Sequence, residues 1–168
     1  MSEYWDILDA DGEKTGKRVK RERFGTLGVG QYHLVVHVWI TNSSGEFLIQ
    51  KRSRNKQPMP GEWAATSGSV KSGEDSRTAA IRELYEELGI PVKPGEIFFV
   101  ERFRRKNSIS DIWHVGVDAY INSLTLQKEE VSAAMWVTPD ELKRMIKKGE
   151  FHNYGMEYFD TVFSLIKG

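Results

Sequence analysis

Between Gly68 and Ile90 the chain reads GSVKSGEDSRTAAIRELYEELGI, a loop followed by the most helix-like segment of the sequence. The pattern predicts a helix over residues 74–88, with Ser72 as its N-cap and Gly89 at its end. A helix turns by about 100° per residue, so three of its acids share one third of the circumference. We expect this acidic face to be exposed and the opposite face to pack on a sheet. The acids are Glu83, Glu86 and Glu87, and the opposite face carries Ile81, Leu84, Tyr85 and Leu88.

An acidic helix face also has an ordinary explanation. Like charges three or four residues apart cost roughly 0.2–0.5 kcal/mol per pair, which a solvated helix tolerates. The surrounding spacing therefore has to decide between a solvated face and a site.

That spacing is specific. After Gly68 come five residues and Glu74, then seven residues and Arg82-Glu83-Leu84, then, each after one residue, Glu86-Glu87 and Gly89-Ile90. Every fixed position of the Nudix box is filled, so the sequence resembles the Nudix hydrolase superfamily. The resemblance implies an α/β fold, a Nudix-type α/β/α sandwich with a mixed sheet. We expect a single Nudix domain over residues 1–168, with residues 68–90 as its loop and helix and residues 1–30 as an N-terminal extension.

The remaining pattern fits such a fold. Alternating residues predict a β-hairpin from 32–40 and 46–52. The basic stretch 14–23 is either a hairpin arm or a mobile lead-in. Further strands are expected at 4–8, 97–103, 112–121 and 134–137, and helices at 139–149 and 156–166.

The resemblance also implies a metal site. Glu83, Glu86 and Glu87 match the positions that hold Mg²⁺, with Mn²⁺ as a substitute, and the carbonyl of Gly68 is a frequent further ligand. Hard oxygen donors suit such a cation. Arg82 matches the arginine that orients Glu83. Glu74 matches the earlier acid that ties the loop to the helix, and a role at the positive end of the helix dipole and a catalytic role are both open for it.

The sequence indicates the general base and the phosphate ligands less clearly than the metal ligands. Glu83 and Glu130 are both candidate general bases, and an exposed loop acid is the alternative for Glu130. Lys51, Arg52 and Lys56 are candidate phosphate ligands, against ordinary surface charge. His33 and His37 share a strand face and are expected to be packed or surface residues rather than metal ligands. Trp63 and Phe103 are candidates for substrate contact, and the alternative for both is a place in the core. The N-terminal extension and the basic residues Arg104, Arg105 and Lys106 are further candidates for substrate contact.

Composition excludes several classes. The chain has no Cys, so disulfide scaffolds, thiolate zinc sites and a cysteine nucleophile are ruled out. The 24 basic residues balance the 24 acidic ones, so bulk charge gives no argument for nucleic acid or a membrane surface. No basic leader or long apolar run occurs, and we expect a cytoplasmic protein.

The expected function is Mg²⁺-dependent pyrophosphohydrolysis of a nucleoside diphosphate linked to a group X, or of a related small diphosphate. The segments 33–39, 47–52 and 60–63 resemble the branch of type 1 isopentenyl-diphosphate isomerases and related bacterial hydrolases. Such isomerases need a Cys where this chain has Ser67 and a His where it has Ser69. Isomerisation and a non-catalytic ligand-binding module are the alternatives, and a homodimer is a further expectation from the resemblance.

Overall fold

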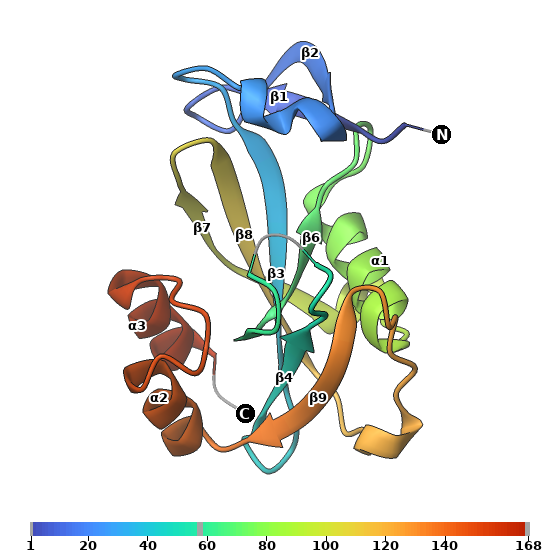
Figure 1. The fold of residues 1–168 in the computed structure, drawn as a ribbon, viewed down its shortest axis with the longest axis vertical. Helices are drawn as coiled ribbons and strands as arrows, with labels where there is room; N and C mark the ends of the chain where they lie inside the picture. Colours follow the sequence, from blue (N-terminus) through green and yellow to red (C-terminus); the bar gives the residue numbers. More distant parts are fainter. Residues whose placement is uncertain (1, 57–58, 167–168) are drawn as a thin grey trace.

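The computed structural model, which describes residues 2–56 and 59–166, has three layers (Figure 1). In the described chain a mixed seven-stranded sheet separates helix α1 (Ser76–Leu88) from helices α2 (Pro139–Lys147) and α3 (Met156–Leu165). The predicted α/β/α sandwich is confirmed.

The sheet has the strand order β5-β4-β3-β8-β7, with β6 paired to β3 and β9 to β4. Strands β3 and β8 are parallel, and the other pairs are antiparallel. The strands are β3 (His33–Thr41), β4 (Phe47–Arg52), β5 (Trp63–Ala64), β6 (Thr66–Ser69), β7 (Ile97–Arg104), β8 (Ser108–Gly116) and β9 (Val131–Val137). Short 3-10 turns occupy Arg21–Thr26, Pro94–Glu96 and Ile121–Ser123. The strand expected over 112–121 thus ends at Gly116, and the one expected over 134–137 begins earlier, at Val131.

One edge of β3 is shared by two strands that diverge. Ile40 and Thr41 pair with β4, whereas Val35 to Val38 pair with β6. Beyond the split, β4 pairs with β5 through Gln50 and Lys51. The segment 63–69 therefore crosses from β4 to β3 and leaves an opening in the sheet beneath α1.

Helix α1 begins later than expected. Its N-cap is Asp75, whose carboxylate accepts a hydrogen bond from the Thr78 N–H at 2.8 Å. Ser72 is not the cap; its hydroxyl donates to Asp6 instead. The helix ends at Gly89, whose φ of 71° lies in the left-handed region that favours glycine.

The expected exposure of the acidic face is confirmed for Glu86 and wrong for Glu87. Glu87 is only 4% exposed, whereas Tyr85, which the helical wheel places on the packed side, is 62% exposed. Helix α1 lies over the split between β4 and β6, so the packed face is rotated toward Glu87. A helical wheel cannot anticipate this rotation, because it assumes that the sheet accepts only apolar side chains.

Two apolar clusters hold the layers together. The cluster on the α1 side includes Val36, Val38, Leu84 and Leu88. The cluster on the other side is rich in aromatic residues and joins Trp39 to α2 and α3. The alternation of β3 side chains between the two faces explains why neighbouring residues belong to different clusters.

The N-terminal extension forms its own hairpin, of the antiparallel strands β1 (Tyr4–Leu8) and β2 (Lys14–Lys20). The basic stretch is thus a hairpin arm. Figure 1 shows this hairpin at one end of the sheet, on the loop that precedes α1. Within residues 2–56 and 59–166, none of the helices has the length and apolarity that a transmembrane span requires.

Candidate active site

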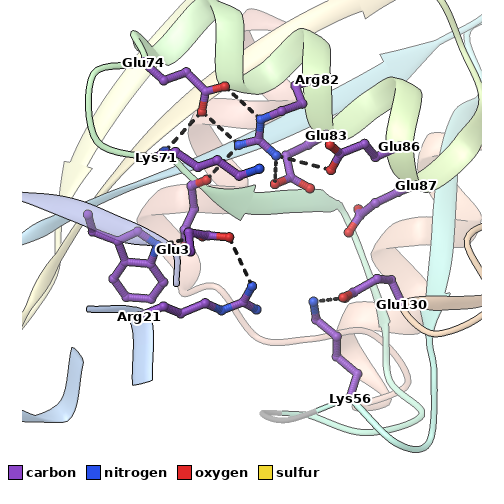
Figure 2. A network of polar contacts seen from close by, with 12 residues as sticks. Glu3, Arg21, Lys56, Lys71, Glu74, Arg82, Glu83, Glu86, Glu87 and Glu130 are labelled. Carbon is purple, nitrogen blue, oxygen red and sulfur yellow. Dashed lines mark hydrogen bonds and ion pairs between the residues drawn. The ribbon is translucent and has the colours of Figure 1, made fainter. Parts of the chain in front are cut away.

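Arg82 is the centre of a polar network at the start of α1 (Figure 2). Its guanidinium donates two 2.8 Å hydrogen bonds to the carboxylate of Glu74 and one of 2.8 Å to Glu83. It also donates to the carbonyl of Ser69, at 3.1 Å, and to Glu86, at 3.3 Å. The planar guanidinium suits this two-sided arrangement. Arg82 thus links the loop, through Glu74 and Ser69, to the acids of the helix.

Glu74 is bound as a structural tie. Burial alone would raise the pKa of its carboxyl, but the hydrogen bonds from Arg82 and the Lys71 N–H outweigh burial and lower it. Glu74 lies before the helix N-cap, so its main interaction is the contact with Arg82 rather than one with the helix dipole.

Glu83 lies directly against Gly68 of β6. A Cβ atom at Gly68 would come within 2.1 Å of the Glu83 carboxyl carbon. Any other residue would therefore displace the Glu83 carboxylate, which explains why a glycine is needed at this point of close approach. The Glu83 side chain is 13% exposed. Burial raises the pKa of its carboxyl, and the charge of Arg82 counteracts this effect.

Glu86 and Glu87 differ in environment. The Glu86 side chain is 44% exposed at the helix surface. Glu87 is buried, and burial, followed by the charge of Glu83, raises the pKa of its carboxyl to about 7. The largely buried carboxylates of Glu83 and Glu87 lie one helical turn apart, and the basic side chains near them offset only part of their negative charge.

Two further residues reach Glu87 from the opening in the sheet. Gln50 of β4 donates a hydrogen bond to Glu87 at 3.0 Å, and Thr66 of β6 donates one to Gln50 at 2.7 Å. Gln50 is 3% exposed and Thr66 is 1% exposed. Sequence reasoning missed both; the available signal was an amide in the apolar run 47–50.

The donor set is suitable for a hard divalent cation. Glu83, Glu86 and Glu87 present carboxylate oxygens on one side of α1, and the glycine of β6 allows Glu83 to approach the loop. In the described residues, no three His, Asp or Glu side chains already converge on one point at ligand distance. Glu83 and Glu86 are both turned to Arg82, whereas Glu87 is hydrogen bonded to Gln50.

Lys56 and Glu130 form an ion pair across from the helix acids (Figure 2). The backbone joins their loops as well, because the Ser53 N–H donates to the Glu130 carbonyl at 2.9 Å. Burial lowers the pKa of Lys56, and it also lowers that of Arg52, which is 7% exposed. The charges of Arg52 and Lys56 both act on Glu87. The structure therefore brings Glu130, Lys56 and Arg52 to the predicted site.

Lys51 is not brought there. Successive residues of a strand point to opposite faces, and Gln50 faces α1. Lys51 instead lines a surface groove with Trp63 and Glu141, on the side of α2. This position separates Lys51 from Arg52 and Lys56, the other candidate phosphate ligands.

The N-terminal hairpin is attached to the loop before α1. Asp6 accepts hydrogen bonds from the Ser72 hydroxyl at 2.7 Å and the Gly73 N–H at 3.1 Å. Arg21, which follows β2, is bound to Glu3 at 3.5 Å. Figure 2 shows its guanidinium pointing into the space bordered by Lys56 and Glu130.

The other sequence candidates have packing roles. His33 stacks on Trp5 at 4.3 Å, and His37 contacts the Tyr158 hydroxyl at 2.6 Å. Phe103 and Trp63 pack against the aromatic cluster on the α2 and α3 side.

The basic residues after β7 also contact the protein itself. Arg104 donates to the Ala10 carbonyl at 3.2 Å, and Arg105 to the Tyr154 carbonyl at 2.8 Å. In the part of the chain that the structure describes, no hydrogen bond or ion pair joins Lys106 to Glu83, Glu86 or Glu87.

Comparison with known proteins gives a consistent result. Residues 31–158 match the model of the NUDIX domain. An uncharacterized Nudix hydrolase of Listeria monocytogenes is 40% identical over 154 residues, covering 90% of this chain and 89% of the relative. The crystal structure of DR0079 from Deinococcus radiodurans has a TM-score of 0.76 at 23% identity, covering 97% of this chain and 99% of that one. The NUDIX domain of Shewanella oneidensis NrtR, solved with ADP ribose, has a TM-score of 0.63 at 13% identity, with 85% and 96% covered. Because both the domain model and a 40% identical relative span most of the sequence, the chain belongs to the Nudix hydrolases, a family of pyrophosphohydrolases.

Proposed function

We propose that this protein is a Mg²⁺-dependent pyrophosphohydrolase, with Mn²⁺ as a substitute, that cleaves a diphosphate bond in a nucleoside diphosphate linked to a group X or in a related small diphosphate. One observation carries the proposal: two largely buried carboxylates, Glu83 held by Arg82 against Gly68 and Glu87 held by Gln50, lie beside the cations Arg52 and Lys56. Buried negative charge next to basic side chains fits a cation and a phosphate binding together.

Glu83, Glu86, Glu87 and the Gly68 carbonyl would hold the metal, as the family resemblance implies. When bound, Mg²⁺ would offset the charge of the diphosphate and polarise the attacked phosphorus centre. Arg82 would keep Glu83 in place through the reaction, because its bonds to Glu74 and Ser69 anchor the guanidinium to groups outside the carboxylate ligand set.

Arg52 and Lys56 would bind phosphate oxygens. When Lys56 turns to the substrate, its ion pair with Glu130 is exchanged for a phosphate contact, and Glu130 becomes free to accept the proton of the attacking water. We favour Glu130 over Glu83 as general base, because Glu83 is held by Arg82 against Gly68.

The N-terminal extension would add a phosphate contact. Arg21 is exposed, and its ion pair with Glu3, at 3.5 Å, is long. Its charge acts on Lys56, alongside the larger effect of burial. We propose that Arg21 binds the phosphate that lies farther from α1.

The substrate class comes from the resemblance and from the ADP ribose bound to the Shewanella domain. The branch near isopentenyl-diphosphate isomerases remains a prediction. None of the three similar proteins above carries an isomerase name, and this chain lacks the cysteine of that mechanism.

The test is metal-dependent product release from nucleoside diphosphates, ADP ribose, nucleotide sugars and dinucleotides. We expect turnover with Mg²⁺ or Mn²⁺ on part of this panel, and its collapse in Glu86→Gln and Glu87→Gln. Glu129→Gln, at an exposed position next to Glu130, is the control that keeps activity. Metal binding without turnover on any substrate would favour the non-catalytic ligand-binding module.

A further inference from the structure

A buried chain of three polar side chains runs from the sheet to α1. The Thr66 hydroxyl donates to the Gln50 amide oxygen at 2.7 Å, and the Gln50 amide nitrogen donates to Glu87 at 3.0 Å. All three residues are at most 4% exposed. Among the described side chains of the candidate site, Arg52 and Glu83 are more exposed, at 7% and 13%.

The chemistry of the groups sets the direction of this chain. The ionised carboxylate of Glu87, the form that would bind a cation, only accepts hydrogen bonds, so the Gln50 NH₂ group faces Glu87 and its oxygen faces Thr66. The threonine hydroxyl supplies the proton that this oxygen needs. Thr66 thus determines which end of the Gln50 amide meets Glu87, and one oxygen of Glu87 is held while the other stays available.

The split in the sheet explains why these side chains meet. Gln50 lies on β4 just after that strand leaves β3, and Thr66 opens β6, which takes over the same edge of β3. Their hydrogen bond spans the opening between the two strands. A leucine at position 50 would leave the buried Thr66 hydroxyl and the Glu87 carboxylate without this partner, so the amide offsets the cost of burying them. The amide therefore serves Glu87 rather than the core.

We propose that Gln50 and Thr66 are positioning residues that hold Glu87 in the orientation in which it binds the divalent metal. This inference rests on the proposed function, in which Glu87 is a ligand. Hydrogen-bonded partners of metal ligands commonly change metal affinity by about 10–100-fold when they are removed.

The test measures the dissociation constant of Mn²⁺ without substrate, from the electron paramagnetic resonance signal of the free ion. We expect Thr66→Val, which keeps the shape and removes the hydroxyl, to weaken Mn²⁺ binding by about 10-fold or more. Thr66→Ser restores the hydroxyl and should bind nearly as the native protein does. Gln50→Leu should weaken binding at least as much as Thr66→Val.

A matched control lies on the other face of β3. Thr41 is also buried, at 2% exposure, and its hydroxyl is 2.8 Å from the His114 ring nitrogen. Because β3 side chains alternate and Ile40 packs on the α1 side, Thr41→Val removes a hydrogen bond on the face opposite α1, so it should cost similar stability to urea and leave Mn²⁺ affinity unchanged. Equal weakening in Thr41→Val and Thr66→Val would overturn the inference, because a general loss of packing would then explain both.

Two further outcomes separate this inference from the proposed function. If Glu87→Gln weakens Mn²⁺ binding but Thr66→Val and Gln50→Leu bind normally, Glu87 is a ligand that needs no positioning and the inference is wrong. If Glu87→Gln binds Mn²⁺ as the native protein does, the proposed ligand set itself fails, and the inference fails with it.

Discussion

The two faces of the central sheet bury polar groups in different ways. On the side of α3, Trp39, His37 and Tyr158 form a closed set: the indole N–H donates to the tyrosine oxygen at 2.9 Å, and the tyrosine hydroxyl lies 2.6 Å from Nδ1 of His37. Because Trp can only donate, Tyr158 accepts from Trp39, and the tautomer of the His37 ring sets the direction of the hydrogen bond between Tyr158 and His37. On the side of α1, Glu83 and Glu87 bury charge without a closed set of partners.

This difference separates stability from function. The closed set is neutral and satisfied, so removing a member leaves buried groups unpaired and lowers stability. The acids on the α1 side are buried at a cost, so neutralising one should leave the fold intact or strengthen it, at the expense of activity. Variants on the two faces should therefore affect different measurements.

The largest effect should come from Glu83→Gln. Metal ligation stabilises transition-state charge by several kcal/mol, so we expect turnover to fall roughly 10²–10³-fold. The amide oxygen can still accept from Arg82, so the free energy of unfolding in urea should change by less than about 1 kcal/mol. Retention of metal-dependent turnover within a few-fold of native would remove Glu83 from the site.

Tyr158→Phe should have the opposite profile. It leaves His37 and Trp39 without their shared partner, and each unpaired buried group costs about 1–3 kcal/mol. We expect a clear loss in the free energy of unfolding, with kcat at low temperature unchanged. Tyr85→Phe, at an exposed tyrosine, is the control for the substitution itself. Native-like stability of Tyr158→Phe would mean that water replaces the lost hydroxyl.

The two faces should also respond to pH with opposite signs. Burial lowers the pKa of His37 to about 3 and that of His33 to about 4, so between these values and about 6.5 the unfolded chain binds more protons and stability falls on acidification. Burial raises the pKa of Glu87 to about 7, from 4.5, so in this overlapping window Glu87 makes stability rise on acidification. Each group changes the slope of the free energy of unfolding against pH by up to about 1.4 kcal/mol per pH unit.

Urea unfolding between pH 5 and pH 7.5 measures these slopes. We expect His37→Leu to flatten the loss of stability toward acid and Glu87→Gln to steepen it. Changes of the same sign in the two variants would contradict the assignment of the opposing groups to the two faces.

The sequence predicted the fold well wherever local pattern and tertiary packing agree. The spacing of the acids, the end of α1 at Gly89 and the hairpin of β3 and β4 needed only local information. Glu87 and Gln50 show the limit, because their burial depends on where β4 and β6 separate, which is a property of strand pairing between distant segments. Lys51 is a different case, because the alternation of side chains along the predicted strand already separates it from Gln50 and Arg52.

The smallest expected effect concerns Arg21, which belongs to neither face and reaches the site from the N-terminal hairpin. Its side chain is 53% exposed and is bound to Glu3 at 3.5 Å, so its loss should leave stability unchanged. If Arg21 contacts the phosphate, Arg21→Ala should raise KM by roughly tenfold or less, because one exposed ionic contact contributes about 1 kcal/mol, and kcat should stay near native.

Lys17→Ala, at an exposed position on the same hairpin, is the control. Steady-state kinetics at 50 mM and 300 mM salt make the comparison sharper, since the KM difference should shrink as salt screens the charge. An unchanged KM in Arg21→Ala at low salt would restrict the extension to supporting the loop before α1 through Asp6.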